Sequence, residues 1–507
     1  MVSKVNTIAP VGFDGILIEV ESDTSRSLPC LQIIGLGNKA VEEAKDRVKS
    51  AISNSMLDFP KKRITVNLAP AELPKDGAHY DLAIALSILC VSGQIRQEEL
   101  GNSIFAGELG LNGELRPIKG AINIAESAKK LKFDSVYLPS SNVDQASLVD
   151  DIEIYGIDSL KQLFLHIKRE VRLSPYRESP TQGQPPLVKR MAFPILDDIN
   201  GQAQAKRALI IAAAGHHNIL MSGPPGSGKT MLAKVLKNLL PELTDREKIE
   251  ATKIHSISGK VAGEIVEERP FRSPHSTSSS ISIIGGGNIP KPGEISLAHT
   301  GVLFLDELPE YSRSVIEALR QPLEDKKIDL SRARAQATYP ANFMLVATKN
   351  PCPCGYYGDN SKECNCTQSQ IINYQKKISG PIMDRIDLVI NVCKVPSKDI
   401  LSNESLTNRQ HKKASEDINN AIEIQRNRYK NCLKYNSCLT NNDIKNAIPL
   451  SADAKIMLVN AIEKLSLSMR SYFKIIKIAR TIADLDGRSD ITTSDIAEAL
   501  QYRQIST

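Results

Sequence analysis

A glycine-rich segment between an apolar run and a helical pattern constrains this chain more than any other feature. The segment consists of Gly223, Pro224, Pro225, Gly226, Ser227, Gly228, Lys229 and Thr230. Glycines in such a turn allow consecutive backbone N–H groups to surround phosphate oxygens at the start of a helix. Lys229 adds a cation for the outer phosphates, and the Thr230 hydroxyl can ligate Mg²⁺. A plain glycine-rich turn is the simpler interpretation, but the flanking strand and helix favour a P-loop that binds ATP.

Two carboxylates follow a second strongly apolar run. Residues 302–305 read Val-Leu-Phe-Leu, and Asp306 and Glu307 come directly after them. If this run is a strand of a parallel sheet, both carboxylates lie at the carboxyl edge, where ligands bind. We expect Asp306 to hold Mg²⁺ and Glu307 to polarise a water for attack on the γ-phosphate. Such a pair is often a helix N-cap, but its position after a P-loop favours the catalytic role.

Three further polar residues are candidates for the same chemistry. Asn350 follows a third apolar run and could orient the attacking water, or it could be an ordinary loop asparagine. Arg385 precedes a predicted strand, where it could reach the nucleotide of a neighbouring subunit or pair with Asp384 or Asp387. Arg470 begins a predicted helix, and its guanidinium is either a γ-phosphate contact or a solvated charge.

The chain divides by pattern into four parts, which its length of 507 residues requires because one hydrophobic core seldom serves so many. Residues 1–167 alternate β-branched stretches with helical patterns and predict an α/β domain. Residues 168–190 are charged and proline-rich and predict an exposed linker. Residues 191–395 alternate strands and helices, which is typical of a parallel sheet covered on both faces. Residues 396–507 read as helical.

The composition is that of a globular protein inside the cell. Hydrophobic residues make up 41% and charged residues 24%, and a net charge of +6 suits a polyanionic partner without demanding one. The N-terminus lacks the pattern of a secretory signal. The most apolar run, at 82–91, is shorter than the ~20 residues of a membrane-spanning helix. We therefore expect a cytoplasmic protein that does not enter the membrane.

Four of the nine cysteines lie close together in sequence, at Cys352, Cys354, Cys364 and Cys366. A disulfide framework is not expected in a large cytoplasmic protein. Four thiolates could close a tetrahedral Zn²⁺ site, which would be structural because no position stays open for water. A single intervening residue is a tighter spacing than the usual two, so reduced and partly buried thiols are the alternative.

The P-loop and the acidic pair, together with three further stretches, resemble the magnesium-chelatase-like AAA+ proteins of the YifB/ComM family. These stretches are Phe271-Arg272-Ser273-Pro274-His275, the run from Gly285 to His299, and the run from Ser379 to Leu388. The resemblance implies an AAA+ core with a parallel sheet and a C-terminal helical lid. It also implies roles for the candidate residues: Walker A for Lys229 and Thr230, Walker B for Asp306 and Glu307, sensor 1 for Asn350, arginine finger for Arg385 and sensor 2 for Arg470.

The same resemblance implies a homo-oligomeric ring, a hexamer, that uses ATP to drive DNA branch migration during recombination in natural transformation. Two insertions fit a channel that faces DNA: residues 271–297, which resemble the family's helix-2 insert, and residues 326–340, which resemble its hairpin before sensor 1. The hairpin carries four basic residues that suit sequence-independent contact with phosphates, although a basic surface hairpin is the simpler alternative. They are Lys326, Lys327, Arg332 and Arg334.

The N-terminal domain resembles the Lon protease domain, an α/β fold similar to domain 2 of ribosomal protein S5. The likeness is carried by Pro74-Lys75-Asp76-Gly77 and by the stretch from Gly107 to Ile118. His79 stands where that family has its catalytic serine, and Asn123 stands where it has the lysine. Neither side chain forms a nucleophile–base pair, so we expect a non-proteolytic domain used for assembly or DNA contact. A Lon-like ATP-dependent protease, or a magnesium-chelatase-type chaperone for metal insertion, is the alternative function.

Overall fold

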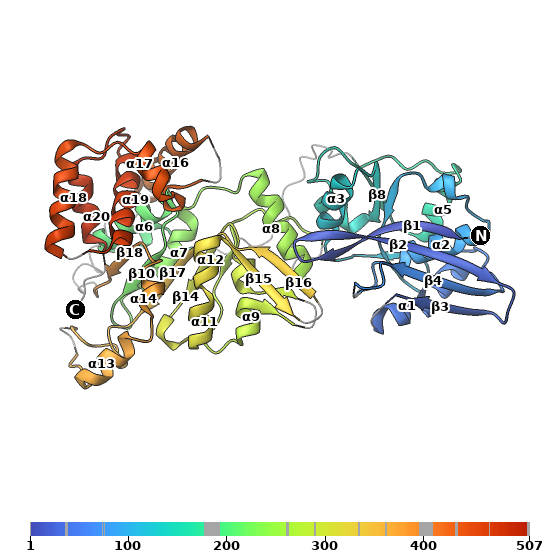
Figure 1. The fold of residues 1–507 in the computed structure, drawn as a ribbon, viewed down its shortest axis with the longest axis horizontal. Coiled ribbons are helices and arrows are strands. Elements are labelled where there is room, and N and C mark those ends of the chain that lie inside the picture. The colour runs from blue at the N-terminus through green and yellow to red at the C-terminus, as the bar shows by residue number, and fades with distance from the viewer. Residues whose placement is uncertain are drawn as a thin grey trace.

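The computed structural model describes residues 2–35, 39–73, 75, 77–176, 193–259, 263–287, 290–332, 335–359, 362–394, 409–430, 434–465 and 467–503. Its N-terminal elements lie at one end of an elongated molecule, its C-terminal helices lie at the other, and a five-stranded sheet lies between them (Figure 1). Within the described ranges, each helix is too short or too polar to cross a membrane.

The first sheet of the N-terminal part has the strand order β1-β2-β4-β3, in which β3 and β4 are parallel and the other pairs are antiparallel. The elements are β1 Ser3–Val11, β2 Asp14–Ser25, β3 Cys30–Ile34, α1 Lys39–Asn54, β4 Arg63–Ala69 and α2 Asp81–Val91. Alternate residues of β4 (Ile64, Val66 and Leu68) are fully buried, as expected for a strand with one face against a core. Helix α2 contributes to the same core, which explains its apolar sequence.

A second, parallel sheet of order β5-β8-β9 completes the N-terminal part. The elements are β5 Ser103–Phe105, β6 Glu108–Leu109, β7 Leu115–Arg116, α3 Ala121–Lys130, β8 Ser135–Pro139, α4 Val143–Ala146, β9 Glu153–Ile157 and α5 Leu160–Ile167. Contacts with this part continue beyond α5. Leu173 packs against the core, and the Tyr176 backbone N–H donates to the Ile154 carbonyl at 2.7 Å.

The central sheet is entirely parallel, with the order β11-β14-β17-β10-β18. Its strands are β10 Ile219–Ser222, β11 Phe271–Arg272, β14 Val302–Leu305, β17 Met344–Lys349 and β18 Leu388–Asn391. Strands buried on both faces are expected to be apolar throughout, and β10 and β14 fit this rule. The mixed α/β class with a parallel sheet, predicted from the sequence, is confirmed.

The two faces of the central sheet pack into different cores because successive strand residues point in opposite directions. Phe304 and Val346 lie in the core shared with the C-terminal helices, whereas Leu303, Leu305 and Leu345 lie in the core shared with the hairpin. The other elements of this part are α6 Ala203–Gly215, α7 Lys229–Leu239, α8 Asp245–Ser258, α9 Ser280–Ile284, β12 Gly285–Gly286, β13 Lys291–Pro292, α10 Glu294–Leu297, α11 Arg313–Ala318, α12 Arg320–Asp325, β15 Lys327–Arg332, β16 Ala335–Pro340, α13 Gln368–Gln375 and α14 Gly380–Met383.

Residues after 408 form the predicted helices. They are α16 Arg409–Tyr429, α17 Asn441–Ala447, α18 Ala452–Leu465, α19 Met469–Leu485 and α20 Thr493–Gln501. Gly487 follows α19 with a φ of +68°, a left-handed conformation that commonly ends a helix. Thr492 is the N-cap, since its side chain and backbone N–H pair with Asp495, and Thr493 is the first helical residue.

The N-terminal part joins the central part through helices α3 and α8. Lys253 of α8 is buried there, forms an ion pair with Glu126 of α3 and lies 3.6 Å from the centre of the Phe13 ring. The Gly120 backbone N–H donates to the Ser256 hydroxyl at 2.9 Å. These contacts join residues far apart in sequence.

Candidate functional site

The glycine-rich segment forms a tight turn between β10 and α7. Gly226 and Gly228 have φ values of +76° and +87°, a region that residues with a side chain rarely adopt. A Cβ atom on Gly223 would lie 2.2 Å from the Val392 carbonyl oxygen, so only glycine fits there. Helix α7 begins at Lys229, immediately after the turn. The Ser227 hydroxyl is buried and has no hydrogen-bond partner in the described part of the chain. The turn therefore presents free donors to a ligand at a helix N-terminus.

Lys229 is nearly buried beneath this turn. Its Nζ donates to the Gly223 carbonyl at 2.7 Å, to the Pro224 carbonyl at 2.9 Å and to Asn350 Oδ1 at 3.2 Å. Burial lowers the pKa of Lys229, while the carboxylates of Asp306 and Glu307 act in the opposite direction. The cation is thus held among oxygen acceptors beside the phosphate-binding turn.

Asp306 and Glu307 follow β14 at the carboxyl edge of the sheet, as predicted. Thr230 Oγ1 donates to Asp306 Oδ2 at 3.3 Å. Thr348, at the end of the neighbouring strand β17, donates from Oγ1 to Asp306 Oδ1 at 2.5 Å and accepts the Glu307 backbone N–H at 2.8 Å. Thr348 was missed from the sequence, because a threonine near the end of a strand reads as an ordinary strand residue. It fixes both carboxylates relative to β17.

Asn350 connects the two halves of the site. Its Nδ2 donates to Glu307 Oε1 at 3.4 Å, and its Oδ1 accepts from Lys229. Glu307 has a φ of +53°, so its backbone is in the sparsely populated left-handed region. Asn350 lies at the carboxyl edge of the sheet, where its position after an apolar run put it, and it contacts Lys229 and Glu307 there. The amide is positioned to hold a water beside the Glu307 carboxylate.

The residues present fit a magnesium ion. The Thr230 hydroxyl and the Asp306 carboxylate are adjacent and offer the oxygen ligands that Mg²⁺ prefers, together with phosphate oxygens of a nucleotide. A magnesium ion in this position would neutralise charge on the β- and γ-phosphates.

Arg385 and Arg470 lie together at the opposite edge of the sheet. Both line a cavity of about 580 Å³ that also includes Asn218 and Asp387, which stand directly before β10 and β18. The lining residues that the structure describes include none from the P-loop. Because the four residues of β10 separate the two edges by about 10 Å, neither arginine is placed to contact the phosphate-binding turn of its own chain.

Glu324 of α12 is the partner of Arg385 in this cavity. The two side chains form an ion pair, and Arg385 also donates to the Pro381 carbonyl at 2.7 Å. Arg470 lies 3.6 Å from Asp384 and 3.9 Å from Glu324. The alternative pairing of Arg385 with Asp384 or Asp387 is not what the structure shows. Asp384 faces Arg470, and Asp387 lies 3.3 Å from His217 Nδ1.

Comparisons with known proteins place this chain in a family. Three profiles match it: "Subunit ChlI of Mg-chelatase" at residues 20–142, "Magnesium chelatase, subunit ChlI" at 195–400, and "Magnesium chelatase, subunit ChlI C-terminal" at 408–503. The competence protein ComM of Haemophilus influenzae is 42% identical over 503 residues, which cover 98% of this chain and 96% of that protein. The chain belongs to the magnesium-chelatase-like YifB/ComM family.

Other relatives include an uncharacterised protein, YifB of Escherichia coli, which is 41% identical over 99% of this chain and 97% of its own length. The similarity to the magnesium-chelatase 67 kDa subunit of Chlorobaculum tepidum is more limited, at 26% identity over 30% of this chain and 23% of that protein. The relatives that match over nearly their full length thus include YifB and ComM proteins.

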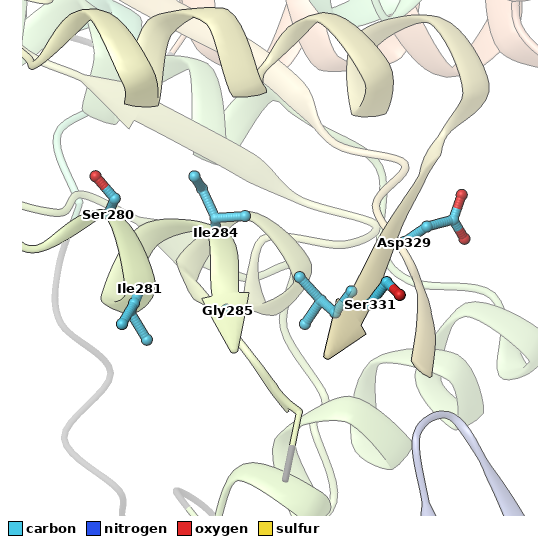
Figure 2. A pocket seen from close by; sticks show the side chains of 7 residues that line it. Ser280, Ile281, Ile284, Gly285, Asp329 and Ser331 are labelled. Carbon is cyan, nitrogen blue, oxygen red and sulfur yellow. The ribbon is translucent and has the colours of Figure 1, made fainter. Parts of the chain in front are cut away.

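The two insertions of this family member lie against each other. Tyr339 of β16 donates its hydroxyl to the Pro290 carbonyl at 2.9 Å, and a hollow of about 230 Å³ lies between α9 and β15 (Figure 2). Of the four basic hairpin residues, Lys326 lines the cavity of Arg385 and Arg470 instead of the hairpin surface. Lys327 is about half exposed and lies 4.0 Å from Asp329. Arg334 and the side chain of Arg332 lie outside the described residues.

The two positions that resemble the Lon dyad are buried. Burial lowers the pKa of His79 to about 4, so its ring is neutral at physiological pH. Asn123 of α3 donates from Nδ2 to the Phe13 carbonyl at 2.9 Å and so supports the turn that meets Lys253. Pro74 and Asp76 lie outside the described residues. Asn123 therefore has a structural contact at the junction with the central part.

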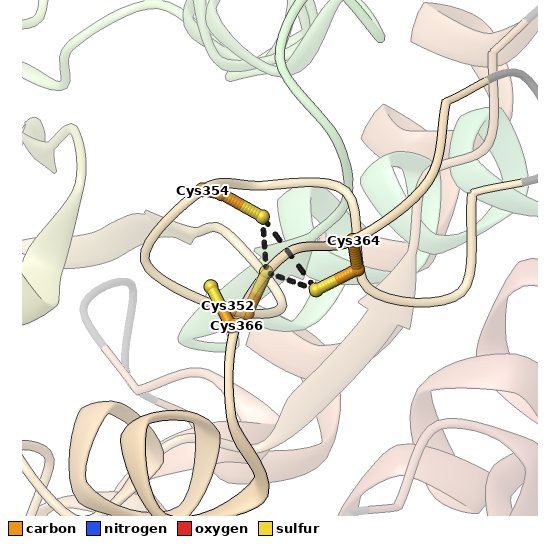
Figure 3. A group of neighbouring side chains, drawn as sticks. All are labelled: Cys352, Cys354, Cys364 and Cys366. Carbon is orange, nitrogen blue, oxygen red and sulfur yellow. Dashed lines mark hydrogen bonds between the residues drawn. The ribbon is translucent and has the colours of Figure 1, made fainter.

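The four predicted metal ligands are brought together. The sulfur atoms of Cys352, Cys354, Cys364 and Cys366 all lie within 4.8 Å of one another, in the loop that follows Asn350 (Figure 3). This cysteine cluster does not include the two carboxylates of Asp306 and Glu307.

Proposed function

We propose that this protein is an ATPase that assembles into a hexameric ring and uses ATP hydrolysis to drive branch migration of DNA. The observation that carries the ATPase part is the convergence of Lys229, Asp306, Glu307 and Asn350 at the carboxyl edge of one parallel sheet. Such an edge is where ligands bind in open α/β sheets. We also propose ATP and Mg²⁺ as its cofactors and the cytoplasm as its location.

Each residue has a distinct task in this proposal. The turn from Gly223 to Thr230 and the Lys229 ammonium bind the phosphates, and Thr230 and Asp306 hold the metal ion. Glu307 accepts a proton from the attacking water, while Asn350 orients that water. Positioning and charge stabilisation account for most of the catalysis of phosphoryl transfer, so these side chains suffice without a covalent intermediate.

The proposal of a ring rests on Arg385 and Arg470. They lie together at the amino edge of the sheet, away from their own P-loop, and their cavity is open enough to take a phosphate group from another subunit. An arginine supplied from a neighbouring chain can stabilise the transition-state charge. Each active site would then be completed by an adjacent subunit, which accounts for assembly into a closed ring.

The proposal of DNA as the substrate rests on the relatives and on the insertions. A full-length relative is named a competence protein, and the hairpin of residues 327–340 and α9 line a common hollow. Lysine and arginine on such a hairpin suit contact with the phosphate backbone of any sequence.

A branch-migration assay tests this function. Purified protein is mixed with a synthetic three-stranded or four-stranded DNA joint, and product strands are measured with ATP, without nucleotide and with a non-hydrolysable ATP analogue. We expect products with ATP alone, and none with the Lys229→Ala variant. A protein that hydrolyses ATP but leaves every joint intact, or that degrades casein when ATP is added, would contradict the assignment.

A further inference from the structure

The loop between β17 and α13 carries a cluster of four thiols that the ATPase chemistry does not use. Cys352 lies at its centre, with its sulfur 3.3 Å from that of Cys354 and 3.7 Å from that of Cys364 (Figure 3). The sulfurs of Cys354 and Cys364 are 3.6 Å apart. All four cysteines are free thiols, since a disulfide would bring two sulfurs to about 2.05 Å.

These spacings fit a metal ion with tetrahedral sulfur ligands. Zinc–sulfur bonds are about 2.3 Å long, which places the four sulfurs about 3.8 Å from one another. The three distances among the sulfurs of Cys352, Cys354 and Cys364 lie slightly below this value, and the Cys366 sulfur lies within 4.8 Å of the others, so a metal at the centre requires only small movements of the sulfurs. Four sulfur ligands without oxygen or nitrogen select a soft or borderline ion such as Zn²⁺ over Mg²⁺ or Ca²⁺.

The surroundings supply the contacts that a thiolate site needs. The Tyr357 backbone N–H donates to the Cys352 sulfur at 3.3 Å. Lys362 lies 4.4 Å from the centre of the Tyr356 ring, two residues after Cys354, and brings positive charge to this loop, whereas the Lys394 ammonium is paired with Asp359 at 2.6 Å. Hydrogen bonds to the sulfurs and nearby cations offset the negative charge of four thiolates around one divalent ion.

The loop also needs a substitute for a hydrophobic core. Residues 350–367 separate β17 from α13, and among the cysteines of this loop only Cys352 is fully buried. Long segments without helices or strands are uncommon in compact domains unless something else holds them. A metal that joins the two ends of the loop provides that support.

The position of the cluster links it to the nucleotide site. Cys352 follows Asn350 after a single proline, and Gly355 packs on the P-loop. A Cβ atom on Gly355 would lie 2.6 Å from Pro225 Cδ and 3.9 Å from Asn350 Cγ. The loop that carries the four thiols therefore forms a wall of the nucleotide site and contacts both the phosphate-binding turn and the water-orienting amide.

We propose that Cys352, Cys354, Cys364 and Cys366 bind one structural Zn²⁺ ion, which fixes the loop at 350–367 and thereby holds Asn350 and Pro225 in position for nucleotide. The metal takes no part in the reaction, because its four protein ligands leave no place for water. Its removal loosens the wall of the nucleotide site. The binding of zinc does not depend on the proposed function. The effect of zinc on nucleotide binding rests on the proposed function only in so far as the P-loop binds nucleotide.

The metal content of the full-length protein is the first test. Protein purified without chelator is analysed by elemental mass spectrometry, with the expectation of about one zinc per chain. The Cys364→Ser and Cys366→Ser variants should lose most of the zinc, whereas Cys30→Ser, a control at an exposed cysteine of β3, should keep it. Replacement by Co²⁺ should give the visible absorption bands of tetrahedral thiolate coordination. Iron in place of zinc, or wild-type protein without metal, would overturn the proposal.

The second test measures the coupling. Zinc is withdrawn from wild-type protein with a thiol-reactive mercurial and a chelator, and binding of a fluorescent ATP analogue is measured before and after the thiols and the metal are restored. We expect weaker nucleotide binding without zinc and recovery with it. ATP turnover should fall about 10- to 100-fold, since misplacing a catalytic group by about 1 Å costs this much. Unchanged nucleotide affinity and turnover in metal-free protein would overturn the coupling. If nucleotide binding depends on zinc but DNA does not change ATP turnover, the zinc proposal is supported and only the proposed DNA function is contradicted.

Discussion

The guanidinium of Arg385 is paired with the carboxylate of Glu324, and only two residues lie between Glu324 and the hairpin of residues 327–340. The same carboxylate lies 3.9 Å from Arg470. The Glu324 carboxylate therefore lies close to both of the arginines that we assign to the nucleotide of a neighbouring subunit. A phosphate group must compete with this carboxylate for Arg385 and Arg470.

Removal of this competitor should raise basal activity. The Glu324 side chain is about half exposed, and exposed ion pairs contribute up to about 1 kcal/mol, which corresponds to at most a roughly fivefold effect. We expect Glu324→Ala to increase ATP hydrolysis without DNA by a few-fold. Glu317→Ala is the matched control, because Glu317 pairs with Arg320 in the same region. A loss of activity in Glu324→Ala would show that the carboxylate positions Arg385 productively.

The shared active site predicts rescue between two inactive variants. Arg385→Ala should bind ATP normally and lose about 10³-fold or more in hydrolysis, because an arginine supplied from another subunit contributes this much. Glu307→Gln should also be inactive. Mixed rings contain some interfaces with an intact Glu307 facing an intact Arg385, so activity should return on mixing. Mixtures as inactive as the separate variants would show that Arg385 does not act across the interface.

Substitutions of Lys229 and Glu307 should affect different steps, ATP binding in the first case and ATP hydrolysis in the second. Lys229→Ala should lose ATP binding, since the ammonium lies at the phosphate-binding turn. Glu307→Gln should keep ATP binding and slow turnover about 10²- to 10⁴-fold, the usual contribution of a general base. Equilibrium binding and single-turnover hydrolysis measure the two quantities. Normal turnover in Glu307→Gln would assign the base to another residue.

The elements that position this site could be predicted from the sequence because each has a local signal. The apolar run at 302–305 is a strand with those bounds, and the two carboxylates and Asn350 lie at its carboxyl edge, where the order of strands and polar residues put them. Thr348 gave no such signal, since its contact with Asp306 depends on the pairing of β14 with β17. The same holds for Glu324, whose partner comes from a distant loop. Side-chain partners across long sequence separations are set by tertiary packing, which periodicity does not reveal.

The buried ion pair between Lys253 and Glu126 predicts a pH-dependent stability. Burial lowers the pKa of Lys253, and Glu126 opposes that shift. Removing the carboxylate in Glu126→Gln leaves the buried ammonium with only the more distant Asp14 carboxylate, at 4.0 Å, and should cost up to about 3–5 kcal/mol in unfolding free energy near neutral pH.

The direction with pH follows from proton binding. Between the lowered folded pKa and the ordinary unfolded pKa of Lys253, the unfolded state binds more protons, so stability rises with pH. The difference between Glu126→Gln and wild type should therefore shrink as the pH rises above neutrality. Urea unfolding at several pH values measures it, with Asp151→Asn as a control on the exposed Lys129–Asp151 pair of α3. A pH-independent or negligible effect would mean that the junction tolerates the Lys253 charge without Glu126.

The most direct measurement of the central claim is the steady-state rate of ATP hydrolysis with and without forked DNA, in wild type and in Lys229→Ala. We expect forked DNA to raise the wild-type rate severalfold, and this stimulation should weaken as salt increases because phosphate contacts release counterions. Lys229→Ala should show no hydrolysis under either condition. A wild-type rate that neither forked nor single-stranded DNA changes at low salt would contradict the account.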